Sequence, residues 1–118
     1  MLTNVKQVDL TIAVGQTNSN VVNGVYATEN AEAVYISAPA ALDAGTYTLE
    51  TNPDPLATNA TAGWTTLQIG DPAADASPPA ASKARVYYEL SACPSWRIKG
   101  PAAVGVDRVF KVSISEYA

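Results

Sequence analysis

The sequence predicts an all-β domain, an antiparallel β-sandwich or jelly roll of about eight short strands. Three observations predict this fold class. Apolar and polar residues alternate along much of the chain, which is the period of half-buried strands. Gly, Pro and Asn residues, which favour turns, separate the alternating runs. No segment shows a sustained helical stripe, and residues 40–44 offer at most one turn of helix.

The first half of the chain predicts four strands, over residues 6–14, 21–28, 33–38 and 46–51. A turn over residues 15–20 closes the first strand, and Gly24 marks a bulge or bend in the second. Pro39 ends the third strand, and a turn at 43–45 starts the fourth. The inward residues are expected to be Val8, Leu10, Ile12, Val14, Val34, Ile36, Tyr47 and Leu49.

The second half predicts a loop over residues 52–63 and further strands over 64–70, 85–91, 95–99 and 107–116. Residues 71–84 are rich in Pro and Ala, which favours an exposed, extended loop or arm. The apolar residues of these strands are Leu67, Ile69, Val86, Tyr88, Leu90, Trp96, Ile98, Phe110, Val112 and Ile114.

The length and the ends of the chain limit its organisation. The 118 residues suffice for one domain with a hydrophobic core, so residues 1–118 are expected to form a single β-sandwich. The one cysteine, Cys93, excludes an intrachain disulfide, and we expect it to act as a small apolar residue. The N-terminus lacks the features of a signal peptide, and no run approaches the roughly 20 apolar residues of a membrane helix. We therefore expect a soluble chain, made in a reducing cytoplasm, with no membrane partner.

The composition argues against an enzyme and against nucleic-acid binding. The chain has no histidine, the commonest general base and metal ligand. An adjacent Ser82 and Lys83 could form a Ser–Lys pair, but adjacency alone is weak support for a nucleophile. The net charge of −4 argues against a nucleic-acid partner. We expect no catalysis, no cofactor and no nucleic acid.

Calcium is the one metal that the acidic residues could bind, because carboxylates are its ligands. Asp71 and Asp75, with Asp54 elsewhere in the chain, could approach one ion from two loops. Their spacing matches no known calcium loop, so we predict no metal site.

The low charge and its distribution favour contacts with other protein copies. Charged residues make up 15% of the chain, compared with about 25% in typical soluble domains. Residues 1–82 hold one base and eight acids, and residues 83–118 hold six bases and three acids. If the fold keeps these regions apart, copies could meet through opposite charges. If strands from both regions interleave, the asymmetry cancels locally.

The aromatic residues allow two interpretations. Trp64 and Trp96 are expected to be core residues, with sugar-stacking platforms as the alternative. Tyr87 and Tyr88 are adjacent in a strand and therefore point to opposite faces, so one of them is expected outside the core. Tyr117 lies one residue from the end of the sequence and is free to contact a neighbour.

Two passages resemble a known family. Residues 44–51 (AGTYTLET) and 63–67 (GWTTL) resemble a hairpin of small bacteriophage virion β-sandwich proteins, and residues 96–100 (WRIKG), 102–104 (AAV) and 107–110 (DRVF) resemble their closing segment. The resemblance implies a capsid decoration (cement) protein or a small head or tail component. Such proteins commonly form trimers over the junctions between subunits of the major capsid protein, and the family carries no catalytic residues.

The resemblance thus implies a non-enzymatic virion protein, made in the host bacterial cytoplasm, that reinforces the shell. Alternatives are a discoidin-like carbohydrate-binding module, which shares the hairpin, and a tail-tube or head–tail connector subunit. We expect the contacts to come from the 71–84 segment and from the N-terminal segment, whose backbone could add to a neighbour's sheet edge. The candidate interface residues are Pro72, Pro78, Pro79, Lys83, Arg85, Tyr87 and Tyr117.

Overall fold

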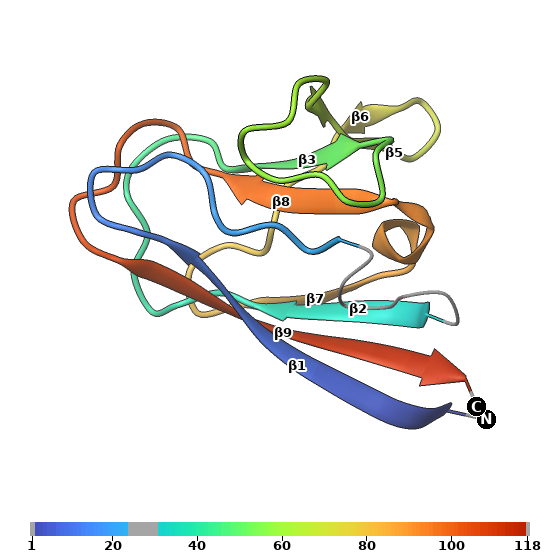
Figure 1. The fold of residues 1–118 in the computed structure, drawn as a ribbon. Helices are drawn as coiled ribbons and strands as arrows, with labels where there is room; N and C mark the ends of the chain where they lie inside the picture. Colours follow the sequence, from blue (N-terminus) through green and yellow to red (C-terminus); the bar gives the residue numbers. More distant parts are fainter. Residues whose placement is uncertain (1, 24–30, 118) are drawn as a thin grey trace.

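A computed structural model describes residues 2–23 and 31–117 and shows strands in two facing layers (Figure 1). The elements are β1 (Leu2–Ile12), β2 (Ala31–Ser37), β3 (Thr48–Asn52), β4 (Thr65–Thr66), β5 (Gln68–Ile69), β6 (Ala74–Asp75), β7 (Ala84–Tyr87), the 3-10 helix η2 (Glu89–Ala92), β8 (Ser95–Lys99) and β9 (Arg108–Tyr117). The all-β prediction is confirmed. No helix among the described residues is long and apolar enough to span a membrane.

All the sheets are antiparallel. The larger sheet has the order β1-β9-β2-β7, the smaller sheet has the order β4-β3-β8, and β5 pairs with β6. Bridges from Asn18 to Lys99 and from Val22 to Trp96 place the chain after β1 along the free side of β8. The smaller sheet is therefore extended by an irregular fourth segment. The jelly-roll connectivity stays a prediction.

The hydrophobic core lies between the two sheets, and strand alternation accounts for it. In β1 and β9, Leu10 lies opposite Phe110 and both are fully buried. The smaller sheet contributes Leu49, Trp96 and Ile98, which are also buried. Because successive side chains of a strand point to opposite faces, the longer strands β1, β2, β3, β8 and β9 each present one apolar row to the other layer. The predicted inward residues of β2, β3, β8 and β9 are confirmed.

The strand pattern predicted for residues 85–91 (Val86, Tyr88 and Leu90) is wrong for its first two members, whereas Leu90 is buried. Tyr87 is 1% exposed, whereas Val86 and Tyr88 are 44% and 65% exposed. The strand ends at Tyr87 and the chain enters η2, which buries Leu90 from a helical turn. A strand period cannot be carried through such a change of conformation. Val14 is 59% exposed for a similar reason, because β1 ends at Ile12 and the chain then turns.

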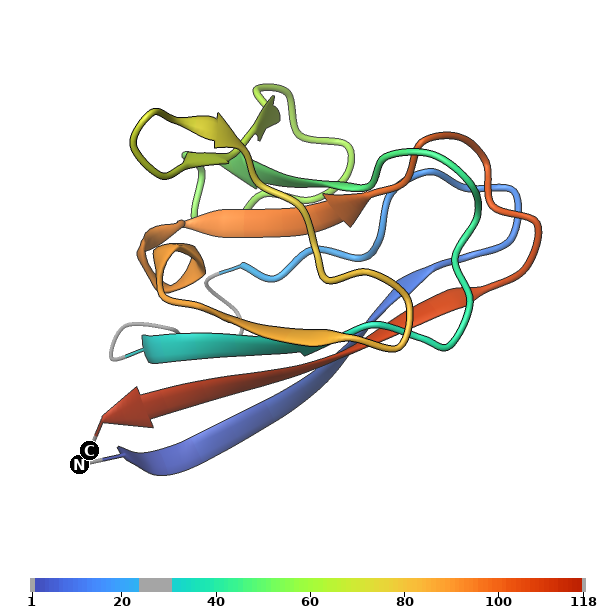
Figure 2. The same ribbon diagram turned by 180° about the vertical axis from the view of Figure 1, so that it is seen from behind.

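The Pro/Ala-rich segment 71–84 is mostly an exposed loop that lies against the domain and contains the short strand β6, so of the two expected forms, loop or arm, it takes the loop. After β6 it runs from the smaller sheet across to β7 (Figure 2). Ala76 donates a backbone hydrogen bond to Leu67 (2.7 Å) and accepts one from Leu49 (2.9 Å). Lys83 accepts a hydrogen bond from the Ala38 N–H (2.9 Å). The segment therefore closes one side of the sandwich.

The predicted second strand, residues 21–28, falls largely outside the described residues. Its described part contributes Val22, which is buried and bridges to β8.

Candidate interaction surface

The side of the larger sheet that faces away from the core carries a layer of side chains, which we call the outer face. Its residues alternate with the buried ones of the same strands, so that three rows run across the sheet. The rows are Val5–Ser115–Ala33, Gln7–Ser113–Tyr35–Val86 and Asp9–Lys111–Ser37–Ala84. Val5, Tyr35 and Val86 are exposed by 59%, 43% and 44%. The outer face thus combines exposed apolar groups with small polar residues.

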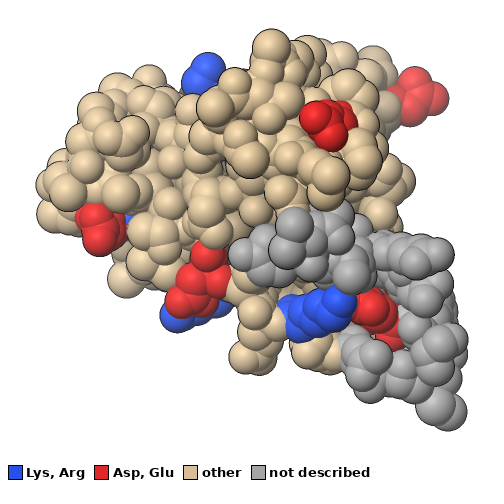
Figure 3. Space-filling model, in the orientation of Figure 1, with Lys and Arg blue, Asp and Glu red and all other residues tan. Residues whose placement is uncertain are grey.

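The charges on the outer face neutralise each other. Lys111 Nζ lies 2.9 Å from Asp9 Oδ2, with the two side chains 69% and 55% exposed. A shallow hollow of about 320 Å³ lies over this pair, between β1 and β9. Figure 3 shows that charged groups are also few and scattered on the side of the molecule drawn there. Asp9 and Lys111 are the only charged residues in the three rows, so most of the outer face can be covered by another protein without removing a charged group from water.

The free edge of β1 is capped over part of its length. The side-chain oxygen of Asn20 accepts a hydrogen bond from the Thr11 N–H (2.8 Å), and its NH₂ group donates to the Asp9 carbonyl (3.1 Å). One amide side chain thereby makes the two bonds that a neighbouring strand residue would make. It ties the C-terminal half of β1 to the segment beside β8, and it leaves the N-terminal half of this edge without such a cap.

The acidic first part and the basic last part of the chain meet inside the domain. Glu50 pairs with Arg97 (2.7 Å), Asp43 with Arg108 (2.7 Å), and Asp9 with Lys111 (2.9 Å). Each pair joins an acid before residue 83 to a base after it. The strands of the two regions therefore interleave, and the charge asymmetry of the sequence cancels locally, as one of the two alternatives expected.

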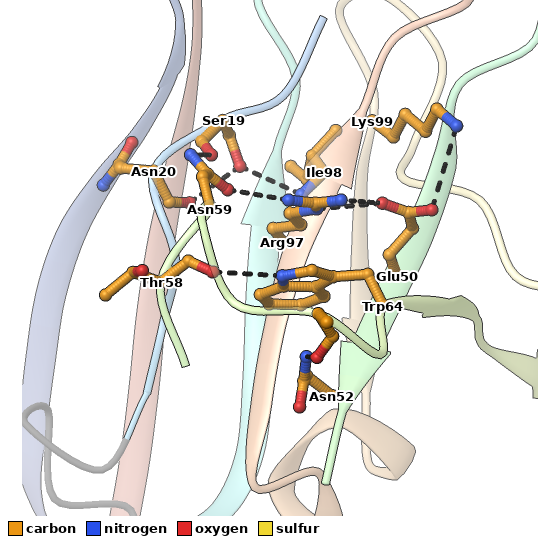
Figure 4. Close-up of polar contacts among 11 residues, drawn as sticks. Ser19, Asn20, Glu50, Asn52, Thr58, Asn59, Trp64, Arg97, Ile98 and Lys99 are labelled. Carbon is orange, nitrogen blue, oxygen red and sulfur yellow. Dashed lines mark hydrogen bonds and ion pairs between the residues drawn. The ribbon is translucent and has the colours of Figure 1, made fainter. Parts of the chain in front are cut away.

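A polar cluster around Arg97, which we call the Arg97 cluster, lies on the smaller sheet, where loop 53–64 covers the outward side of β3 and β8 (Figure 4). Arg97 on β8 donates from Nε to Glu50 Oε1 on β3 (2.8 Å) and from Nη1 to Asn59 Oδ1 in the loop (2.9 Å). The Arg97 and Glu50 side chains are each 8% exposed. Lys99 lies 3.9 Å from the other Glu50 oxygen. This is a buried ion pair whose remaining hydrogen-bonding capacity is used to hold a loop.

Trp64 completes this cluster. The Arg97 guanidinium lies 4.2 Å from the centroid of the indole ring, a cation–π stack. The indole Nε1–H donates to the Thr58 carbonyl (3.1 Å). One ring face and the N–H are thus used within the chain, and Trp96 is 1% exposed in the core. Trp96 is confirmed as a core residue, whereas the expectation of a core position is wrong for Trp64, which lies outside the core cluster and fastens the loop.

A pocket of about 380 Å³ lies between the turn before β3 and the 77–81 segment, beside Asp43 and Tyr47. The Tyr47 hydroxyl accepts a hydrogen bond from the Asp43 N–H (3.1 Å). The hydrogen bond from Arg108 lowers the pKa of Asp43, and burial raises the pKa of Tyr47. Asp43 is already ion-paired with Arg108, so neither Asp43 nor Tyr47 offers a free ionised group to a ligand in this pocket.

The candidate interface residues do not form one surface. Pro78, Pro79 and Tyr87 are buried against their own chain, and the Tyr87 hydroxyl donates to the Ser77 carbonyl (2.6 Å). These three therefore offer a partner little surface, which corrects their assignment. The exposed members are Pro72, Lys83 and Arg85, for which a contact role stays a prediction. The backbone of Tyr117 belongs to β9, but its side chain lies outside the described residues.

Two of the three acidic residues weighed for calcium have separate partners. Asp75 accepts a hydrogen bond from Gln68 (3.0 Å), and Asp54 accepts one from the Leu56 N–H (2.9 Å). Within the described residues no group of three potential metal ligands converges. Cys93 is half-buried against the core, and burial raises the pKa of its thiol.

No family model, curated protein or solved structure matches this chain.

Sequence reasoning missed the outer face and the Arg97 cluster. A signal for the first was available, because Tyr35 lies between the inward Val34 and Ile36 and must point the other way. The row that brings Tyr35 beside Val86 depends on a pairing between strands far apart in the sequence. The same holds for Glu50 and Arg97, which are cross-strand partners.

Proposed function

We propose that this protein is a non-enzymatic structural component that acts through contacts with other protein chains, and that its outer face makes those contacts. The observation that carries the proposal is the row in which Tyr35 and Val86 are exposed side by side on a face with little net charge. Strand-borne side chains hold such a face rigid, so little conformational entropy is lost when it is covered.

The setting that we propose is a bacteriophage virion, with the major capsid protein as partner and a role in reinforcing the shell. Residues 44–51, 63–67 and 96–110 support this setting through their resemblance to decoration proteins. Many weak, equivalent contacts on a symmetric shell would add up to tight attachment. Homo-oligomers fit the same proposal, and three is the copy number that the resemblance implies.

The first test asks whether the purified protein assembles with copies of itself through the outer face. The native mass of the purified protein is measured by sedimentation equilibrium at low and high salt, together with the variants Tyr35→Glu and Leu56→Glu. Leu56 is 65% exposed on loop 53–64, away from the outer face, and is the matched control.

We expect wild type to assemble, Tyr35→Glu to give a smaller species, and Leu56→Glu to behave as wild type. We expect salt to have little effect, because the acidic and basic regions are paired within the chain. Equal masses for wild type and Tyr35→Glu would refute the role of the outer face in contacts between copies of this chain.

A further inference from the structure

We propose that two copies pair through the N-terminal half of β1, antiparallel and about a two-fold axis at Val5, so that their larger sheets join into one. The inference deepens the proposed function and rests on it, since it names a second copy of this chain as one of the partners. A two-fold contact gives an even number of copies, so the inference replaces the trimer that the resemblance implies. It is carried by the backbone of β1, not by the side chains of the outer face.

The first step is to identify which peptide groups of β1 point away from β9. In an antiparallel ladder, the residues whose N–H and C=O both turn away from the partner strand alternate along the chain. Asn20 binds the Thr11 N–H and the Asp9 carbonyl, so this set contains the odd-numbered residues. Val5 and Gln7 belong to it, and none of the described residues bonds to their outward groups. An edge of this kind is a template for another strand.

The second step is the length of the open edge. Asn20 occupies the edge at Asp9, so an added strand must end before that residue. At the other end, a shift in register between Leu2 and Asn4 interrupts the ladder with β9. The regular open edge therefore centres on Val5 and Gln7.

The third step is the register between the two β1 strands. Only a few positions of the two-fold axis place residues whose N–H and C=O point away from β9 opposite residues of the same kind in the other copy. An axis at Lys6 places the two Lys6 side chains directly opposite each other. Each is ion-paired with Glu116 of its own chain (3.1 Å), and two cations facing each other in that position weaken the pairing. An axis at Gln7 pairs Val5 with Asp9, where Asn20 already occupies the edge. An axis at Val5 pairs Val5 with its copy, Asn4 with Lys6 and Thr3 with Gln7. It avoids both conflicts and leaves the register shift around Thr3 at the two ends of the joint. The geometry thus selects Val5.

This pairing extends the outer face. Val5 belongs to the outermost row and is 59% exposed. In the pair, the two Val5 side chains lie next to each other at the centre of a continuous sheet, which carries one outer face on each side of the axis. The termini lie at the same projecting end of β1 and β9 (Figure 1).

The first test uses proline as a probe of the edge. Proline is accepted at edge positions whose N–H faces solvent, but it cannot donate to an added strand. We expect Val5→Pro to abolish the pair in sedimentation equilibrium between about 1 µM and 1 mM, a range that covers the Kd values of weak interfaces. Its thermal unfolding should remain close to that of wild type. Val5→Thr, which keeps the N–H, should still pair.

The second test fixes the register by cross-linking in a Cys93→Ser background. Residues opposite each other in such a pair have Cα atoms about 5.5 Å apart, within the range of a disulfide. Val5→Cys should therefore form a disulfide-linked dimer under mild oxidation. The two Gln7 residues would lie about 14 Å apart, so Gln7→Cys should not. Cross-linking of Gln7→Cys in preference to Val5→Cys would overturn the inference.

The outcomes separate this inference from the proposed function. If both hold, Tyr35→Glu falls to a dimer, and adding Val5→Pro gives a monomer. A wild-type trimer, or a dimer that survives Val5→Pro, overturns the β1 pair and leaves the outer face to be judged by Tyr35→Glu. A wild type that is a dimer, is unaffected by Tyr35→Glu and is dissociated by Val5→Pro supports the β1 pair and refutes the outer-face contact.

Discussion

Replacing Arg97 with methionine is expected to destabilise the domain much more than the same replacement at Lys111. Both bases bind a carboxylate at similar distance, with Arg97 Nη2 2.7 Å from Glu50 and Lys111 Nζ 2.9 Å from Asp9. They differ in burial, since the Arg97 side chain is 8% exposed and the Lys111 side chain 69%. The comparison therefore sets a buried ion pair against an exposed one.

The magnitude follows from what each substitution leaves behind. Arg97→Met leaves the 8% exposed Glu50 carboxylate with only Lys99, at 3.9 Å, and it also removes the Asn59 bond and the Trp64 stack. Breaking a buried pair in this way costs about 3–5 kcal/mol. Lys111→Met leaves Asp9 in water, and an exposed pair contributes about 0–1 kcal/mol. The expected difference is roughly 3 kcal/mol, or about 10 °C in melting temperature for a chain of this size.

Urea unfolding followed by tryptophan emission measures both variants, because Trp96 lies in the core and Trp64 lies on Arg97 itself. Adding Glu50→Gln to Arg97→Met removes the orphaned charge, so the double variant should lose at least ~1 kcal/mol less than the sum of the single variants. Equal losses for Arg97→Met and Lys111→Met would refute the reasoning, since burial would then not determine the strength of the pair.

Two further predictions concern the fold. A Cβ at Gly45, where φ is +119°, would lie 2.6 Å from Pro101 Cβ, whereas at Gly15, with φ +80°, it meets nothing within 4 Å. Gly45→Ala should therefore lose about 3–5 kcal/mol and Gly15→Ala about 1–2 kcal/mol in urea unfolding, and equal losses would contradict the clash. Burial raises the pKa of Tyr87 to about 12. The contribution of this shift to the free energy of unfolding is therefore complete below about pH 10, and about 2–3 kcal/mol of it is lost as the pH rises toward 12. Tyr87→Phe should flatten this decline in urea titrations, and an unchanged alkaline decline would assign it to other groups.

The strands that could be predicted are those in which one face is apolar from end to end. In β9, Phe110, Val112 and Ile114 alternate without interruption, and the expected inward face is the observed one. The pattern failed where the chain changed conformation within an apolar run. Tyr87 and Leu90 are both buried, but one lies on β7 and the other on η2, so no single period places both inward.

The Pro/Ala segment shows a different limit of sequence reasoning. Its composition indicates that it lacks the regular alternation of apolar and polar residues that marks a strand, and that is correct for most of its length. Composition does not say whether such a segment leaves the domain or crosses it, because that depends on bonding partners elsewhere in the chain. Ala76 has partners in Leu49 and Leu67, and these draw the segment onto the sandwich.

The candidate surfaces were the least predictable part, because they are properties of pairing between strands. Glu50 and Arg97 lie 47 positions apart in the sequence, and the outer face needs β1, β9, β2 and β7 in that order. A single side chain can also decide how far such a surface extends.

The amide of Asn20, in the segment beside β8, determines where the open edge of β1 ends, and so which residue can lie on a two-fold axis. An Asn20→Ala variant would lengthen the open edge to include Asp9 and Thr11, and the preference for an axis at Val5 over one at Gln7 should then weaken. Cross-linking at Gln7→Cys in that background measures this loss directly.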